Sequence, residues 1–117
     1  MIAAPAGVRV YLSARPCDMR KGLNGLAAEV QNTLKADPFG GSLYVFRGKR
    51  GDMLKILAWD GSGLCLFVKR LEQGRFVWPP IVDGRLQLMA GQLSLLLEGI
   101  DWRRTVAPLA TRVPEAV

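Results

Sequence analysis

The feature that most constrains the fold of this chain is a run of three β-rich segments joined by short turns that contain glycine. The segments are residues 43–46, 53–59 and 64–68, and the turns between them include residues 48–51 and 60–63. Turns this short join strands that run antiparallel to each other. The sequence therefore predicts an antiparallel β-meander.

The meander is expected to continue beyond its third strand. Residues 72–74 supply another turn, and the β-rich residues 75–78 predict a fourth strand that a pair of prolines ends. Residues 86–88 predict a short strand at most. Near the start of the chain, residues 8–12 alternate apolar and polar side chains, which is the pattern of a half-buried strand.

Two other segments carry apolar residues at helical spacing. Residues 19–36 predict an amphipathic helix, with Asp18 as its N-cap. A second helix is predicted to end at Gly99, which would be its C-cap. The apolar positions are Leu23, Leu26, Ala27, Val30 and Leu34 in the first helix and Leu93, Leu96, Leu97 and Ile100 in the second.

Together these segments predict an α+β fold, in which an antiparallel β-meander sheet packs against two helices. The chain has 117 residues, half of them hydrophobic, which is the size and composition of one domain with a real core. We assign this domain to residues 1–104. Proline, alanine and threonine dominate residues 105–117, and no apolar periodicity remains there, so the sequence predicts a flexible, disordered C-terminal tail.

The composition excludes several protein classes. No apolar run reaches the roughly 18 residues of a membrane span, and the first residues lack the basic and apolar segments of a signal peptide. We therefore expect an intracellular protein without a membrane partner. Cys17 and Cys65 are expected to be reduced thiols, with Cys65 in the core. The chain has no histidine, which removes Ser-His-Asp and Cys-His catalysis and leaves too few ligands for an ordinary zinc site.

The carboxylates do not form the pattern of a nuclease. Two-metal catalysis needs several convergent acids. Asp52 and Lys55 are three residues apart, so they would point to opposite faces of a strand. Asp60 and Asp83 each precede glycine, which is typical of turns. The sequence therefore predicts a protein that is not an enzyme and that has no metal or other cofactor.

The charge of the chain is positive and unevenly distributed. The chain has 16 Lys and Arg against 10 Asp and Glu, a net charge of +6. Residues 1–80 hold 12 of the basic and 6 of the acidic residues, whereas residues 81–117 hold 4 of each. A basic body and a neutral end favour a polyanion such as DNA as a partner. An ordinary solubility charge is the alternative interpretation.

Half of the cations cluster at turns and strand ends, and we predict that they form a nucleic-acid-binding face. Arg47, Lys49 and Arg50 lie at the first hairpin tip, Arg20 and Lys21 at the start of the first helix, and Lys69, Arg70 and Arg75 around the third turn. In an antiparallel meander the first and third turns lie at the same end of the sheet. Such a face would bind phosphates mainly by charge. Charges beside glycine are also typical of ordinary soluble turns, which is the alternative.

Six stretches of the chain give it a family resemblance. They read GVRVYL, DMRKGL, FRGKRGD, DGSG, KRLE followed by GRFVWP, and LLEGIDW, in order along about residues 2–104. On these stretches the chain resembles the accessory protein TnpB, or Orf2-like protein, of bacterial insertion sequence 66 elements.

The resemblance implies a role in transposition beside a separate, larger transposase that carries the catalytic acids. It implies neither catalytic residues nor established binding residues for this chain. Two functions remain open: binding of DNA or of a transposase–DNA complex, and a protein adaptor that holds the transposase or another accessory protein without touching DNA. DNA, the transposase and another accessory protein are the expected partners, and a cytoplasmic, nucleoid-associated bacterial protein is the expected setting.

Overall fold

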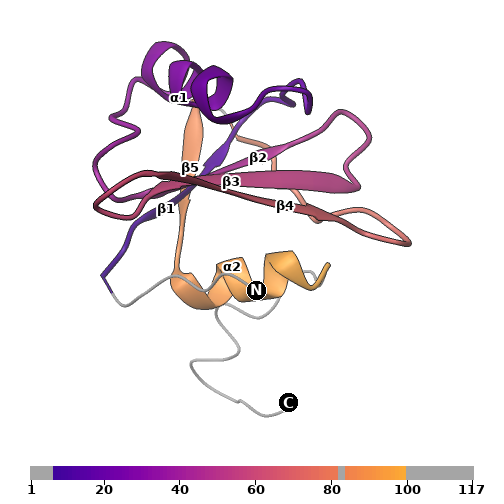
Figure 1. Ribbon diagram of the computed structural model, residues 1–117. Coiled ribbons are helices and arrows are strands. Elements are labelled where there is room, and N and C mark those ends of the chain that lie inside the picture. The colour runs from indigo at the N-terminus through magenta and orange to yellow at the C-terminus, as the bar shows by residue number, and fades with distance from the viewer. Residues whose placement is uncertain (1–6, 82–83, 100–117) are drawn as a thin grey trace.

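The computed structural model describes residues 7–81 and 84–99. The five strands form one sheet in the order β4-β3-β2-β1-β5. Figure 1 shows helix α1 above this sheet and helix α2 below it, so the α+β domain has three layers. The elements are β1 (Val10–Ser13), α1 (Leu23–Asn32), β2 (Leu43–Arg47), β3 (Met53–Trp59), β4 (Leu64–Arg70), β5 (Arg85–Leu88) and α2 (Ala90–Leu97).

The sheet is mixed, so the prediction of a purely antiparallel meander is wrong. β2, β3 and β4 do form the predicted antiparallel meander. β1, however, lies parallel to β2, with Val10 opposite Leu43 and Leu12 opposite Val45. The reason is the helix between these two strands. A helical crossover returns the chain to the end of the sheet where it started, whereas a short turn reverses the chain direction.

The predicted fourth strand at residues 75–78 is not a strand. After β4 the chain leaves one edge of the sheet and crosses to β5 at the other edge, where β5 pairs antiparallel with β1. Two hydrogen bonds fix the crossing segment: the Phe76 N–H donates to the Gly51 carbonyl at 2.8 Å, and the Trp78 indole N–H donates to the Ser13 carbonyl at 2.9 Å. The two prolines that follow have no N–H for a strand ladder.

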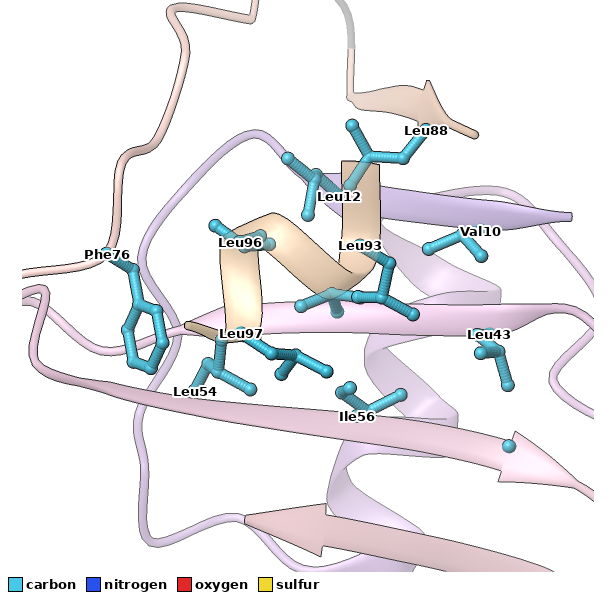
Figure 2. Close-up of a cluster of buried hydrophobic side chains, with 12 residues drawn as sticks. Val10, Leu12, Leu43, Leu54, Ile56, Phe76, Leu88, Leu93, Leu96 and Leu97 are labelled. Carbon is cyan, nitrogen blue, oxygen red and sulfur yellow. The ribbon is translucent and has the colours of Figure 1, made fainter. Parts of the chain in front are cut away.

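Each face of the sheet has its own hydrophobic core. Figure 2 shows the core under α2, where Leu93, Leu96 and Leu97 pack onto side chains of four strands and onto Phe76. The strand residues of this core are Val10, Leu12, Leu43, Val45, Leu54, Ile56, Ala58 and Leu88. On the opposite face, α1 and the segment after it cover Tyr44, Phe46 and Leu57. Because both faces are covered, the inner strands are apolar on both sides.

The first helix is shorter than its apolar pattern predicts. It begins at Leu23 rather than at residue 19 and ends at Asn32, and Gly22 is its N-cap, without a side-chain hydrogen bond. The prediction of Asp18 as the N-cap is therefore wrong. Its carboxylate instead accepts the backbone N–H of Arg20 at 2.9 Å, which closes a local turn before the helix. In α2 the C-cap is Glu98, so the prediction of Gly99 as the C-cap is wrong by one residue; Gly99 directly follows the cap with φ of 75°.

Two predictions fall outside the described residues: the domain boundary at residue 104 and the tail at residues 105–117. Among the helices that the structure describes, none has the length and apolar character needed to cross a membrane.

Candidate nucleic-acid interface

The turn after β2 and the loop after β4 lie at the same end of the sheet, on the right in Figure 1. The Leu71 N–H donates to the Asp52 carbonyl at 2.7 Å, so the end of β4 is joined directly to the start of β3. The Phe76 N–H donates to the Gly51 carbonyl at 2.8 Å. These bonds place the predicted first and third turns beside each other.

The segment that precedes α1 packs against the same hairpin tip. The Cys17 N–H donates to the Arg47 carbonyl at 2.8 Å, beyond the end of the β1–β2 ladder. Met19 lies so close to Gly48 that a Cβ atom at this glycine would be only 2.7 Å from the Met19 Cγ. A side chain at this position would therefore force the Met19 side chain to move. The parallel pairing of β1 with β2 brings this segment to the tip.

These segments enclose an open pocket of about 370 Å³ at the end of the sheet. Its walls come from the segment before α1, from the hairpin between β2 and β3, and from the last residue of β4. They consist of Cys17, Asp18, Met19, Gly48, Lys49, Arg50, Asp52, Met53 and Arg70.

The structure brings four of the eight predicted cations to this end of the sheet in exposed positions. Lys49, Arg50 and Arg70 line the pocket, and all three are exposed. Arg75 is exposed as well. Its side-chain carbons would lie 3.4 to 3.6 Å from a Cβ atom placed at Gly51, so Arg75 lies beside the hairpin tip. None of these four makes an ion pair with a carboxylate in the part of the chain that the structure describes. Four positive charges are thus presented to solvent at one end of the sheet.

Arg20 and Lys21 lie nearby, but both are already paired. The guanidinium of Arg20 binds the Asp18 carboxylate through two nitrogens, with the shortest distance at 2.8 Å, and these hydrogen bonds lower the pKa of Asp18 well below its usual range. The Lys21 ammonium binds Glu29 on α1 at 2.8 Å. Since α1 begins at Leu23, both cations precede the helix rather than lying in its first turn.

Arg47 and Lys69 point to the opposite face of the sheet. Both lie in register with Leu54, which belongs to the core under α2. The Arg47 guanidinium lies 5.6 Å from the ring centroid of Trp78, and burial lowers its pKa. The structure therefore does not unite all eight predicted cations on one face.

Sequence reasoning missed the acidic and apolar members of the pocket. Asp18 and Asp52 carry negative charge into a wall that also holds three cations, and Met19 and Met53 add apolar surface. These residues are far apart along the chain, and only the parallel β1–β2 pairing brings them together. No local pattern in the sequence indicates this meeting.

The two thiols are not activated. Cys65 is exposed, so the prediction that it lies in the core is wrong. Its S–H donates to Asp60 Oδ2 at 3.4 Å, and this hydrogen bond raises the pKa of the Cys65 thiol. Burial raises the pKa of Cys17 in the pocket wall. Within the described ranges, the His, Cys, Asp and Glu residues form no group of three or more that could hold a metal ion.

Comparison with known proteins identifies the family. Residues 8–107 match the family described as IS66 Orf2 like protein. The chain belongs to this family. Two relatives of this IS66 Orf2-like protein come from Sinorhizobium fredii (strain NBRC 101917 / NGR234). Protein y4jC is 46% identical over 104 residues, which are 89% of each chain. Protein y4hO is 48% identical over 103 residues, which are 88% of this chain and 90% of the relative. No solved structure shows significant similarity to the chain.

Membership of the IS66 Orf2-like family confirms the resemblance found in the sequence and gives the protein an accessory role in transposition. The family is an accessory one and is not known for catalysis. The match covers every strand and helix described above, including all of the pocket.

Proposed function

We propose that this IS66 Orf2-like protein is a non-catalytic accessory factor that binds DNA, or a transposase–DNA complex, through the exposed cations around the pocket. The observation that supports this proposal most is the meeting of Lys49, Arg50 and Arg70 in one pocket wall, although Lys49 and Arg50 come from the hairpin tip and Arg70 from the end of β4. Arg75 extends the same positive end.

Charge and shape both favour a phosphate backbone as the partner. The tip residues Lys49 and Arg50 project from the sheet on a turn in which Gly51 adopts φ of 82°. A projecting tip of this kind can follow a phosphate strand, and contacts to phosphate carry no sequence information. The proposed binding is therefore driven by charge and tolerant of sequence, and a transposase would supply the specificity.

The decisive experiment measures binding to the terminal repeats of the element at several salt concentrations. Changing Lys49 and Arg50 together to Ala should weaken binding to all sequences alike. The slope of log affinity against log salt should flatten by about one or two units, since each neutralised phosphate contributes about −0.9 on duplex DNA. The fold should survive because both side chains are exposed, and such changes usually alter stability by less than about 0.5 kcal/mol.

A matched control removes two exposed cations at the other end of the sheet. Arg9 precedes β1, and Lys35 follows α1 with φ of 54°. Changing Arg9 to Ala and Lys35 to Asn lowers the charge equally, and asparagine tolerates that backbone conformation. This variant should keep the parent salt slope. If the tip variant binds DNA as the parent does at every salt concentration, the proposed site is wrong.

A protein adaptor is the second candidate function, and the mixed character of the pocket favours it. The carboxylates of Asp18 and Asp52 would repel a phosphate, whereas Met19 and Met53 offer apolar contacts suited to a protein side chain. An adaptor would bind the transposase or another accessory protein without DNA. Binding to purified transposase that needs no DNA and persists at high salt would support this alternative.

A further inference from the structure

β4 is an outer strand of the sheet, and no other strand among residues 7–81 and 84–99 pairs with its outer edge. The Asp60 N–H donates to the Gly63 carbonyl at 3.1 Å, and the Leu71 N–H donates to the Asp52 carbonyl at 2.7 Å. Hydrogen-bonded pairs alternate along an antiparallel ladder. Odd-numbered residues from 63 to 71 therefore bond to β3, and Leu64, Leu66, Val68 and Arg70 direct their N–H and C=O groups outward.

The side chains of β4 are incompletely covered on both faces of the sheet. Leu64, Leu66 and Phe67 are only half-buried, and the side chain of Val68 is 49% exposed. β3, the next strand, buries four of its seven residues. The centre of β4 carries no proline and no charge, the usual features that keep an edge strand from pairing with another chain.

We propose that two copies of this chain pair antiparallel along their β4 edges, so that the two sheets become continuous. One register uses all four outward residues: Leu64 faces Arg70 of the second copy, and Leu66 faces its Val68. Phe67 then meets Phe67 of the second copy on the two-fold axis. The same patch serves both copies, which is the requirement for a closed dimer. The inference is independent of DNA binding.

The charges of β4 suit a second copy better than another extended peptide. Lys69 and Arg70 stand at one end of the strand, so antiparallel pairing places the two basic ends apart. In the same register Lys69 lies opposite Cys65 of the second copy, and the Cys65 thiol is 3.4 Å from the Asp60 carboxylate. Lys69 can therefore reach Asp60 of the second copy. Neither residue belongs to an ion pair within the described chain.

The first test is the oligomeric state of the full chain. Sedimentation velocity across a micromolar dilution series should show a species of twice the 12.8 kDa chain mass. Val68→Lys should shift this species to monomer because it places a charge against Leu66 of the second copy. Val68→Pro should do the same because it removes an outward N–H without touching the β3 ladder. Leu23→Lys is the matched control on α1, where the leucine is 41% exposed, and it should leave the dimer intact.

The second test fixes the register by disulfide formation in a Cys17→Ser, Cys65→Ser background. Phe67→Cys should cross-link under mild oxidation, since directly opposed residues of a non-hydrogen-bonded pair have Cα atoms about 4.5 Å apart, within disulfide range. Val68→Cys should not, because its symmetry mate is a diagonal neighbour at about 7–8 Å.

Three outcomes would overturn the proposal. The parent chain stays monomeric throughout the dilution series, a dimer persists in both Val68 variants, or Val68→Cys cross-links more readily than Phe67→Cys. The Val68 variants must retain the parent circular dichroism spectrum, and Leu23→Lys shows whether a lysine at an exposed apolar position affects assembly by itself.

Discussion

At the scale of single residues, Lys21 shows how a cation near the proposed DNA site can serve the fold instead. Its ammonium binds Glu29 at 2.8 Å, with the two side chains 38% and 23% exposed. Its backbone carbonyl accepts a hydrogen bond at 2.8 Å from the Lys55 ammonium on β3. The segment before α1 is thus tied both to the helix and to the sheet, which holds the pocket wall in place.

This ion pair predicts a pH-dependent loss of stability in Lys21→Met. The hydrogen bond from Lys21 lowers the pKa of Glu29 in the folded protein. The stabilisation is therefore present above the usual glutamate pKa near 4.3 and is lost as the pH falls through the lower, folded value. Urea unfolding at pH 7 should show a loss of about 0.2–1 kcal/mol, the range for exposed pairs.

In acid, the stabilities of Lys21→Met and the parent should converge. Lys49→Met is the control, since Lys49 pairs with no carboxylate among the described residues. A difference between Lys21→Met and the parent that stays constant with pH would show that the ion pair is not its cause.

The close approach of Met19 to Gly48 predicts an energetic coupling between the hairpin tip and the segment before α1. A Cβ atom at this position would meet the Met19 Cγ at 2.7 Å, so Gly48→Ala should destabilise the domain by about 1–3 kcal/mol. Adding Met19→Ala should recover part of the loss, which a double-mutant cycle by chemical denaturation measures. Gly63→Ala is the control, because open space surrounds that glycine. Strictly additive effects of the two substitutions would contradict the proposed contact.

At the scale of elements, α2 depends on packing rather than on its own helical preference. It has only eight residues, and helices this short are marginal in water. Leu93, Leu96 and Leu97 are almost fully buried against the sheet (Figure 2). The helix therefore forms because it closes the second core.

Leu96→Ala should destabilise the domain by about 2–5 kcal/mol, because it removes a side chain that is 0% exposed and leaves a cavity. Thermal unfolding followed by circular dichroism measures the change. Leu23→Ala, an exposed leucine on α1, should stay within about 0.5 kcal/mol of the parent. Similar losses in the two variants would mean that α2 does not close the core as described.

Elements joined by short local turns could be predicted from the sequence, and those that depend on distant partners could not. The β2–β3–β4 meander follows from its turn residues. The parallel pairing of β1, and the crossing segment that ends in β5, depend on contacts between distant parts of the chain.

The candidate site divides in the same way. Lys49 and Arg50 project because they occupy a turn, whereas the meeting of Asp18 and Met19 with that turn depends on the parallel pairing of β1 with β2. The placement of Lys69 and Arg70 on opposite faces of the sheet could have been predicted, since the side chains of consecutive strand residues point to opposite faces.

At the scale of the whole molecule, the distribution of acids predicts no nuclease activity. The purified protein should cleave neither single- nor double-stranded DNA with added magnesium or manganese, since metal-dependent cleavage needs convergent ligands and the described part of the chain holds no such group. A gel-based cleavage assay checks this. Cleavage that depends on metal and disappears in Asp52→Ala would contradict the prediction.

The two cores differ in when they can be completed as the chain leaves the ribosome. The buried residues of the α1-side core all lie between Leu26 and Leu57, so that half can assemble early. The other core joins Val10 and Leu12 to residues as late as Leu97. Until α2 has emerged, one face of the sheet remains bare and liable to aggregate. This core is therefore completed only after α2 has been synthesised, and a chain that stops before α2 would leave that apolar face of the sheet uncovered.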